Sequence, residues 1–495
     1  MTDVQDLQEK QFKIAPNRQS AAGRGRMISN EPGGDERPPV DADVDDKLYR
    51  KVLWRIAPIL FLCHAISFLD RVNIGFAKLQ MLGGLQISDA AFALGASVFF
   101  VGYIALEIPS NIVMHRVGAR LWIARIMFSW GVVSVGTLFT AELAHVFGIG
   151  NATMFYVMRF LLGCCEAGFY PGMLLYINYW FPSNRQTKVT SGLLLALPLS
   201  LVFGGPLSGW LMYQTQGWFG YNGWQWMLAI EGTPPIVLAF VVYFGLSDHI
   251  SKARWLTPEE KSRLEANLVA ERVTKIVHFG AAVRDYRVWM VAGIVFSYAT
   301  GFYGLSFWLP SIIHVGGVTD TRSIGLLTAI PFVAAAASML FNTWHSSKTG
   351  ERRWHAAIPA FTGAAGLMLS AAFQDNLPLA IFFLSVAAAG ILGLTPVVWT
   401  YPGSLLTGTA AAAGIAMINS FGSLSGIAGS MIVNVMRELT GNLNNGTYAL
   451  GAVLCCTGIL VLALPASTFA AGNRGVTRNT LLRRVYSSRL SRKVP

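Results

Sequence analysis

Long runs of apolar residues recur from end to end of this 495-residue chain. Each run has about 20 residues, the length that an α-helix needs to cross roughly 30 Å of hydrocarbon. The runs are continuously apolar, whereas a strand of a membrane barrel has about 10 residues that alternate between apolar and polar. The sequence therefore predicts an all-α membrane protein. The twelve predicted transmembrane helices span 53–77, 89–114, 119–140, 151–178, 189–213, 224–246, 288–314, 322–343, 355–373, 377–401, 406–437 and 446–470.

The composition supports a membrane protein. Hydrophobic residues make up 53% of the chain and charged residues only 13%, about half the share usual in soluble domains. All five cysteines fall inside predicted spans without metal-ligand spacing to a histidine, so we expect buried free thiols and no metal. The chain has no HExxH, Walker lysine, GxSxG elbow or GxGxxG after a strand. A membrane enzyme is therefore not supported, and no cofactor is expected.

Lysine and arginine gather in the loops on one side of the predicted spans. These loops follow spans 2, 4, 6 and 8, and the basic C-terminal tail lies on the same side. Because basic loops stay in the cytoplasm, both termini are expected there. The net charge of +12 is thus explained by topology, and no nucleic-acid partner is expected because a folded basic domain is missing. The compact loops favour a bacterial inner membrane.

The longest interior polar segment, 248–287, divides the spans six and six. Related basic turns containing glycine follow span 2 at 115–120 and span 8 at 348–353. We therefore predict two pseudo-symmetric six-helix bundles, with a substrate site between them near the membrane midplane, and a monomer. The predicted segments are a disordered cytoplasmic tail (1–50), the first bundle (51–247), a cytoplasmic linker with an amphipathic helix capped at Thr257 (248–287), the second bundle (288–471) and a basic tail (472–495).

Several motifs occur in an order that resembles a known family. They are LDRVNIGFA at 69–77, GYIALEIPSNIVMHRVGARLWIARIMFSWG at 102–131, RFLLGCCEAGFYPG at 159–172, ARWLTPEEK at 253–261 and AAAAGIAMINSFGSLSG at 410–426. Together they resemble the anion:cation symporter family of the major facilitator superfamily, over about 53 to 470. The resemblance implies proton-driven uptake of organic carboxylates of the tartrate, phthalate, nicotinate or hydroxyphenylacetate type.

The resemblance also implies where a substrate would bind. Tyr103 in span 2, Trp399 in span 10 and Asn419 in span 11 match family positions that face substrate. Tyr303 in span 7, with Tyr298, can add an aromatic wall. Ordinary packing or an interfacial belt remains the alternative for each aromatic residue, whereas a buried amide such as Asn419 needs a partner.

Span 1 carries two adjacent full charges far from its start, Asp70 and Arg71, with the amide of Asn73 beside them. An ionisable residue in a span costs several kcal/mol unless it faces a wet cavity or a partner, so it points to a functional site. Their position near the expected outer end of span 1 leaves an alternative, an ion pair that anchors the helix at the headgroup boundary.

Span 4 carries Arg159 and Glu166 and no other charge. Seven residues turn a helix by nearly two full turns, so both side chains share one face, about 10 Å apart along the axis. We expect them to face the same cavity as Asp70 and Arg71. The alternative is a buried Arg–Glu pair that only fixes helix packing.

The two residue types together suggest a mechanism. Arginine stays charged and its planar fork matches a carboxylate, whereas a carboxyl in a site of low dielectric can take up or release a proton near neutral pH. The hypothesis is that Asp70 and Glu166 bind protons, while Arg71, Arg159 and Asn73 hold these acids or the substrate anion. Protonation of Glu166 would then free Arg159 for the carboxylate. A proton-independent exchanger or facilitator, or a nutrient receptor that does not transport, remains open.

Overall fold

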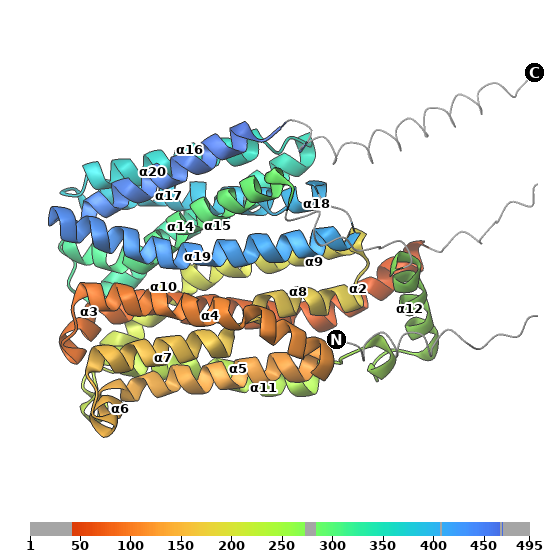
Figure 1. Ribbon diagram of the computed structural model, residues 1–495, viewed down its shortest axis with the longest axis horizontal. Helices are drawn as coiled ribbons and strands as arrows, with labels where there is room; N and C mark the ends of the chain where they lie inside the picture. The colour runs from red at the N-terminus through yellow and green to blue at the C-terminus, as the bar shows by residue number, and fades with distance from the viewer. Residues whose placement is uncertain (1–41, 273–283, 406–407, 466–467, 469–495) are drawn as a thin grey trace, which may run out of the picture. The chain divides into compact units, whose positions relative to one another are not determined.

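A computed structural model describes residues 42–272, 284–405, 408–465 and 468, and every regular element in these ranges is a helix. The contacts discussed below lie within 48–465. The elements, coloured along the chain in Figure 1, are α2 (Ala42–Val72), α3 (Ile74–Leu85), α4 (Asp89–Val117), α5 (Ala119–Gly136), η1 (Thr137–Phe139), α6 (Thr140–Phe147), α7 (Asn151–Glu166), α8 (Phe169–Trp180), α9 (Ser183–Leu194), α10 (Ala196–Gln214), η2 (Trp218–Gly220), α11 (Gly223–Gly245), η3 (Ile250–Lys252), α12 (Pro258–Arg272), α14 (Tyr286–Val315), α15 (Thr321–Thr349), α16 (Trp354–Ala372), α17 (Leu377–Val398), α18 (Tyr401–Leu405), α19 (Gly408–Thr440) and α20 (Leu443–Ala463).

The prediction of an all-helical membrane protein is confirmed. Eleven helical stretches in the described part of the chain are long and apolar enough to cross a membrane, and they coincide with eleven of the twelve predicted spans. The remaining predicted span, 406–437, corresponds to α19, a helix of 33 residues. Residues 406–407 at its predicted start lie outside the described ranges, as do 1–41 of the predicted N-terminal tail and the predicted C-terminal tail.

The first span is longer than predicted. It runs over α2 and α3 from Val44 to Leu85 and ends where Gln86 adopts a left-handed conformation. The prediction that it ends at residue 77, which leaves Lys78 outside the span, is wrong. Lys78 lies inside α3 and is buried, because Asp89 supplies its counter-ion. A charge that has a partner does not need to end a membrane helix.

The fourth span is broken instead of continuous. α7 ends at Glu166, and α8 begins at Phe169 after Gly168, whose φ is +83°. A Cβ atom at this glycine would lie 2.5 Å from the Ser110 hydroxyl of α4, so both the backbone conformation and the close approach require glycine. The break leaves Glu166 at the end of a helix, where its side chain can reach a neighbouring one.

Helices pack closely within each predicted half. α4 lies against α7 and α5 against α11 in the first half, while α14 contacts α19 and α16 contacts α17 in the second. The two halves meet where α10 contacts α15, α4 contacts α19 and α3 contacts α14. α4 consequently lies between α7 and α19 (Figure 1).

The predicted surface helix in the linker is present as α12. Its first turn is closed by Thr257 and Glu260, each of whose side chains accepts a hydrogen bond from the backbone N–H of the other. Glu260 also forms an ion pair with Lys51 of α2 at 2.8 Å. Residues 273–283 of the linker lie outside the described ranges.

Candidate functional site

Asp70, Arg71 and Asn73 lie in the middle of the first span. Asp70 stands 15 residues before the end of α3 at Leu85, which is about 22 Å along a helix. The expectation that they lie near the outer end is therefore wrong, because the helix continues well past residue 77. Asp70 and Asn73 are buried, so an anchor at the headgroup boundary does not describe them.

Arg71 joins residues of both halves. Its Nη2 donates to Oε1 of Glu166 on α7 in a buried ion pair, and its Nη1 donates to the Tyr303 hydroxyl on α14 at 3.3 Å. Its guanidinium also lies 5.1 Å from the ring centre of Tyr103 and 5.5 Å from that of Phe99, both on α4. Only about 10% of the Arg71 side chain is exposed. Helices α2, α4, α7 and α14 thus converge on one cation.

Arg159 contacts the same ring. Its guanidinium is 4.9 Å from the ring centre of Phe99, so both arginines lie over this phenylalanine. The side chain is buried, and its Nε and Nη2 have no hydrogen-bond partner among the described residues. A buried guanidinium with two free donors is a ready binding group for an anion.

The structure differs from the predicted pairing. Glu166 was expected to hold Arg159, but it bonds Arg71 of α2. Arg159 and Glu166 share a face about 10 Å apart along α7, and Glu166 extends toward α2 instead of along its own helix. Glu166 therefore reaches across to α2 and leaves Arg159 with free donors.

Asp70 points into the first half, away from Arg71. Its Oδ1 accepts from the Ser134 hydroxyl at 2.7 Å, and its Oδ2 from the indole N–H of Trp130 at 2.5 Å, both on α5. Asn73 donates its amide to Asp70 at 3.4 Å and to Glu231 of α11 at 2.9 Å. Asn73 was expected to hold an acid or the substrate, and in this structure it bridges the carboxyls of Asp70 and Glu231.

Asn419 and Trp399 do not reach this cluster. Asn419 donates to Oε1 of Glu107 on α4 at 2.6 Å, and Ser420 donates to Oε2 at 3.0 Å, which links α4 to α19. The indole N–H of Trp399 donates to the Tyr298 hydroxyl at 3.0 Å within the second half. The structure therefore brings together Arg71, Glu166, Tyr103 and Tyr303, flanked by Arg159 and Asp70, and leaves these two residues apart.

Sequence reasoning missed two buried acids, Glu107 and Glu231. Glu231 is the only residue with a full charge in its predicted span, 224–246. Glu107 shares its predicted span, 89–114, only with Asp89 at the very start. Both acids are buried. The rule that singled out Asp70 and Glu166 applies to them equally, so the signal was present. Their polar partners, Asn419 and Asn73, were found without them.

The halves are closed against each other where Asp89 lies, and we call this the Asp89 end. Asp89 of α4 pairs with Lys78 of α3 at 2.8 Å and with Arg437 of α19 at 2.5 Å. The Lys78 ammonium lies 3.5 Å from the ring centre of Trp308 on α14. Deeper in, the Ser430 hydroxyl on α19 donates to the Ala93 carbonyl on α4 at 3.1 Å.

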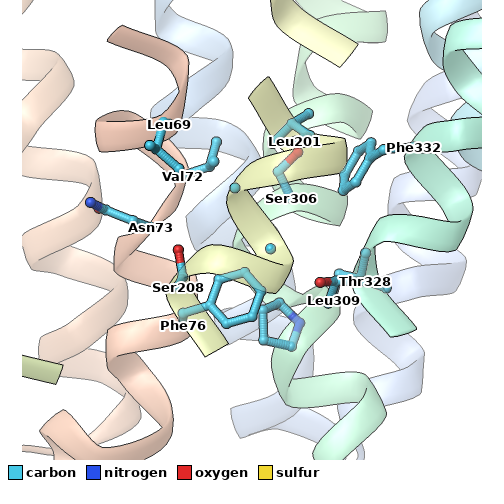
Figure 2. A pocket seen from close by; sticks show the side chains of 13 residues that line it. Leu69, Val72, Asn73, Phe76, Leu201, Ser208, Ser306, Leu309, Thr328 and Phe332 are labelled. Carbon is cyan, nitrogen blue, oxygen red and sulfur yellow. The ribbon is translucent and has the colours of Figure 1, made fainter. Parts of the chain in front are cut away.

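A small cavity lies just inside this closure, with a volume of about 10 Å³, which is about the room that one water molecule needs. Figure 2 shows that residues of both halves line it: Asn73 and Ser208 on one side, Ser306 and Thr328 on the other. Asn73 is the one predicted site residue in its wall. No group of three or more potential metal ligands occurs in the described part of the chain.

Comparisons with known proteins agree with this architecture. Residues 60–430 match the sequence pattern of the Major Facilitator Superfamily. A Pseudomonas putida protein named as a metabolite transport protein, NicT, is 41% identical over 433 residues, which cover 86% of this chain and 97% of that protein. An Agrobacterium vitis protein named as a tartrate transporter is 41% identical over 432 residues, covering 87% and 94%. The crystal structure of a D-xylose–proton symporter has a similar fold, with a TM-score of 0.67 and 16% identity over 84% of this chain and 98% of that one.

Proposed function

The chain belongs to the Major Facilitator Superfamily, and we propose that this membrane transporter takes up a small organic carboxylate together with protons. Two relatives are named for metabolite and tartrate transport, which supports an organic acid as the substrate. The class proposed is a tartrate-like acid or an aromatic acid such as phthalate, nicotinate or hydroxyphenylacetate.

One observation carries the proposal: a buried acid holds one arginine while a second arginine beside it has free donors. Arg71 is bonded to Glu166, and Arg159 faces the same Phe99 ring with two unpartnered nitrogens. Four buried carboxyls, Asp70, Glu107, Glu166 and Glu231, lie in these helices. Arginine remains charged, whereas a carboxyl can become neutral, so protons provide the variable charge in the site.

Protonation of Glu166 starts the proposed cycle. A neutral carboxyl no longer attracts the Arg71 guanidinium, which then turns with Arg159 toward an incoming carboxylate. The two forks can hold one carboxylate between them or the two carboxylates of a dicarboxylate. Tyr303 and Tyr103 border Arg71 and contact the bound acid. The exchange makes proton binding and anion binding depend on each other.

Asp70 supplies a second proton site in this proposal, because its charge lies within electrostatic reach of Arg159. Asn73 orients Asp70, and Asn419 and Trp399 contact substrate only when the halves rearrange. We place the protein as a monomer in a bacterial inner membrane with both termini in the cytoplasm. The Asp89 end then faces outward, which the distribution of basic loops supports.

Reconstituted protein in liposomes tests the proposal. Uptake of labelled tartrate and nicotinate is measured with and without an inward proton gradient, and again after a proton ionophore. Glu166→Gln should lower accumulation at least tenfold yet keep counterflow within about threefold, since binding and exchange need no net proton movement. Asp375→Asn removes an exposed acid between α16 and α17 and should behave as the parent. Uphill uptake by Glu166→Gln at the parental rate would refute the assignment.

The same measurements separate the alternatives. A facilitator or an exchanger would transport with no dependence on the proton gradient, and the exchanger would also require acid inside the vesicles. A nutrient receptor would bind the acid without moving it. The free donors of Arg159 favour binding of an anion in all three cases, so only the response to the gradient distinguishes symport.

A further inference from the structure

Glu231 is a buried acid for which the proposed exchange of Arg71 has no use. It is the only charged residue of α11, and about 2% of it is exposed. Its Oε1 accepts from the Ser208 hydroxyl of α10 at 2.7 Å, and its Oε2 accepts from the Asn73 amide at 2.9 Å. No ion pair of Glu231 occurs among the described residues. A buried carboxyl without a cation is costly to keep ionised.

Asn73 connects Glu231 to Asp70. Its single amide donates to both carboxyls, at 2.9 Å and 3.4 Å, so the two acids lie on either side of one side chain. α11 comes this close to α5 because residue 232 is glycine: a Cβ atom there would lie 2.8 Å from the Ser134 hydroxyl, which bonds Asp70. Two carboxyls that share one donor in a medium of low dielectric repel each other when both are ionised, so a proton on either one relieves that repulsion.

The surrounding helices supply no other charge to Glu231. α10 and η1 have no charged residue, and Tyr213 of α10 is exposed. The basic residues of α5 lie in its first seven residues, where Arg120 bonds Asp248 and Arg125 lies over Trp122. Lys78 of α3 pairs with Asp89. Asp70 of α2 is thus the titratable group that faces Glu231.

The cavity inside the Asp89 end gives this pair access to the boundary between the halves. Ser208 and Asn73, the two donors to Glu231, both line the cavity (Figure 2). Ser306 of α14 lines the opposite wall, and its buried hydroxyl has no hydrogen-bond partner in the described part of the chain. A hydroxyl can both donate and accept, so Ser306 adds a polar group on the path toward the two donors.

The cavity is sealed by close contact between α10 and α15. A Cβ atom at Gly205 would lie 2.4 Å from the Thr328 hydroxyl, and one at Gly209 would lie 2.3 Å from the Thr321 carbonyl. In this arrangement the contact cuts Glu231 off from the Asp89 side. Separation of α10 and α15 would expose the wall that contains Ser208 and Asn73 to water there, so access to Glu231 would change with the arrangement of the halves.

We propose that Glu231 is a second proton-loading site, which takes up its proton through this cavity and shares it with Asp70 through Asn73. The proposal rests on the proposed function and adds to it a separate entry for the second coupling proton. A proton from water on the Asp89 side converts the Glu231 carboxylate to a neutral carboxyl. The other proton binds to Glu166 in the Arg71–Glu166 exchange. Glu231 and Glu166 are thereby protonated at different places.

Proton stoichiometry tests this assignment. The full chain is reconstituted in liposomes, and the number of protons per tartrate is measured from the reversal of net flux at opposed substrate and pH gradients. Glu231→Gln keeps the size of the side chain and an acceptor for Asn73 but cannot bind a proton. It should lose one proton per substrate while counterflow stays within about twofold of the parent. Asp375→Asn, which changes an exposed acid between α16 and α17, serves as the control and should keep the parental stoichiometry.

Ser208→Ala provides a second test that keeps the acid. The carboxylate loses a donor that stabilises its charged form, so the pH of half-maximal uptake should move upward with unchanged stoichiometry. An unchanged stoichiometry in Glu231→Gln, or a fall in counterflow equal to the fall in coupled uptake, would overturn the assignment. So would an unmoved pH profile in Ser208→Ala. A parent protein with no proton coupling would refute the proposed function itself, whereas a coupled parent with an equally coupled Glu231→Gln refutes this inference alone.

Discussion

Replacing Asp89 with asparagine should open the Asp89 end of the protein. Asp89 pairs with Lys78 inside its own half and with Arg437 of the other half. In the closed arrangement the Lys78 side chain is only about 5% exposed and lies against Trp308 of the other half. Asparagine removes the counter-ion and leaves two cations facing each other across the boundary. Separation of the halves lets Lys78 reach water.

The size of the effect follows from the exposure of each partner. The Asp89–Arg437 pair is 27% and 39% exposed, so its loss costs about 1 kcal/mol at most. Leaving a buried cation without its counter-ion costs about 3–5 kcal/mol. Part of this cost is offset, because asparagine still offers a carbonyl to Lys78 and Trp308 still contacts the ammonium. A net shift of about 2 kcal/mol toward the open arrangement is expected, which is about 30-fold in the equilibrium constant.

Thiol labelling measures this shift. The five native cysteines are replaced, and Thr328→Cys places one reporter in the cavity wall, where Thr328 is buried in the closed arrangement. A membrane-impermeant reagent added on the Asp89 side should label the Asp89→Asn protein about 30-fold faster than the parent at equal reagent. Asp89→Glu should restore most of the slow rate, because it keeps the charge.

Asp320→Asn is the matched control for this prediction. Asp320 also lies at the end of a helix, but it caps its own helix α15 by accepting from the Ser323 N–H at 2.8 Å. Its loss should leave the labelling rate within about twofold of the parent, because no charge across the boundary changes. Equal labelling of the parent and Asp89→Asn, or equal acceleration by Asp320→Asn, would show that Asp89 does not hold the halves together.

Three further predictions use other contacts. Glu107→Ala removes the acceptor of two hydrogen bonds from α19, which weakens the contact between the halves away from the Asp89 end. The halves should then open more often on that side and less often at the Asp89 end, so labelling of the same reporter should slow by about tenfold. An accelerated rate would contradict this prediction. Gly205→Val places methyl groups against α15 and should abolish counterflow, whereas Gly83→Val, where a Cβ meets nothing within 4 Å, should retain it. Glu351 caps α16, and although burial raises its pKa, hydrogen bonds from Trp354 and His355 lower it overall. Glu351→Gln should therefore be less stable by about 1 kcal/mol at pH 7 in thermal unfolding, and the difference should shrink as the pH falls through the lowered pKa that Glu351 has in the folded state, and vanish where the acid is protonated in both states.

The twelve spans were predictable because each depends on local properties, length and hydropathy. The errors occurred where a polar residue has a partner elsewhere in the chain. The predicted first span stopped short of Lys78, whose counter-ion, Asp89, lies on the next helix. The break at Gly168 was also missed, since its cause is the approach of Ser110 from α4. Such causes lie between helices, and a single sequence does not display them.

The candidate site divides in the same way. Helical periodicity showed that Arg159 and Glu166 share a face, and this follows from one helix alone. It could not show that Glu166 bonds Arg71, because that contact depends on how α7 lies against α2. Glu107 and Glu231 were detectable by the rule for charges in membrane spans, but their roles depend on the two asparagines that meet them from other helices.

The adjacency of Asp70 and Arg71 connects the two groups of acids. Successive residues on a helix point about 100° apart, so the acid and the base of this pair face different neighbours. Asp70 faces α5 and, through Asn73, Glu231 of α11, while Arg71 faces Glu166 of α7 and Tyr303 of the other half. Protonation on either side therefore changes the forces on the same turn of α2. Because that turn also contacts α14, a change of charge inside the first half reaches the boundary along which the halves must separate.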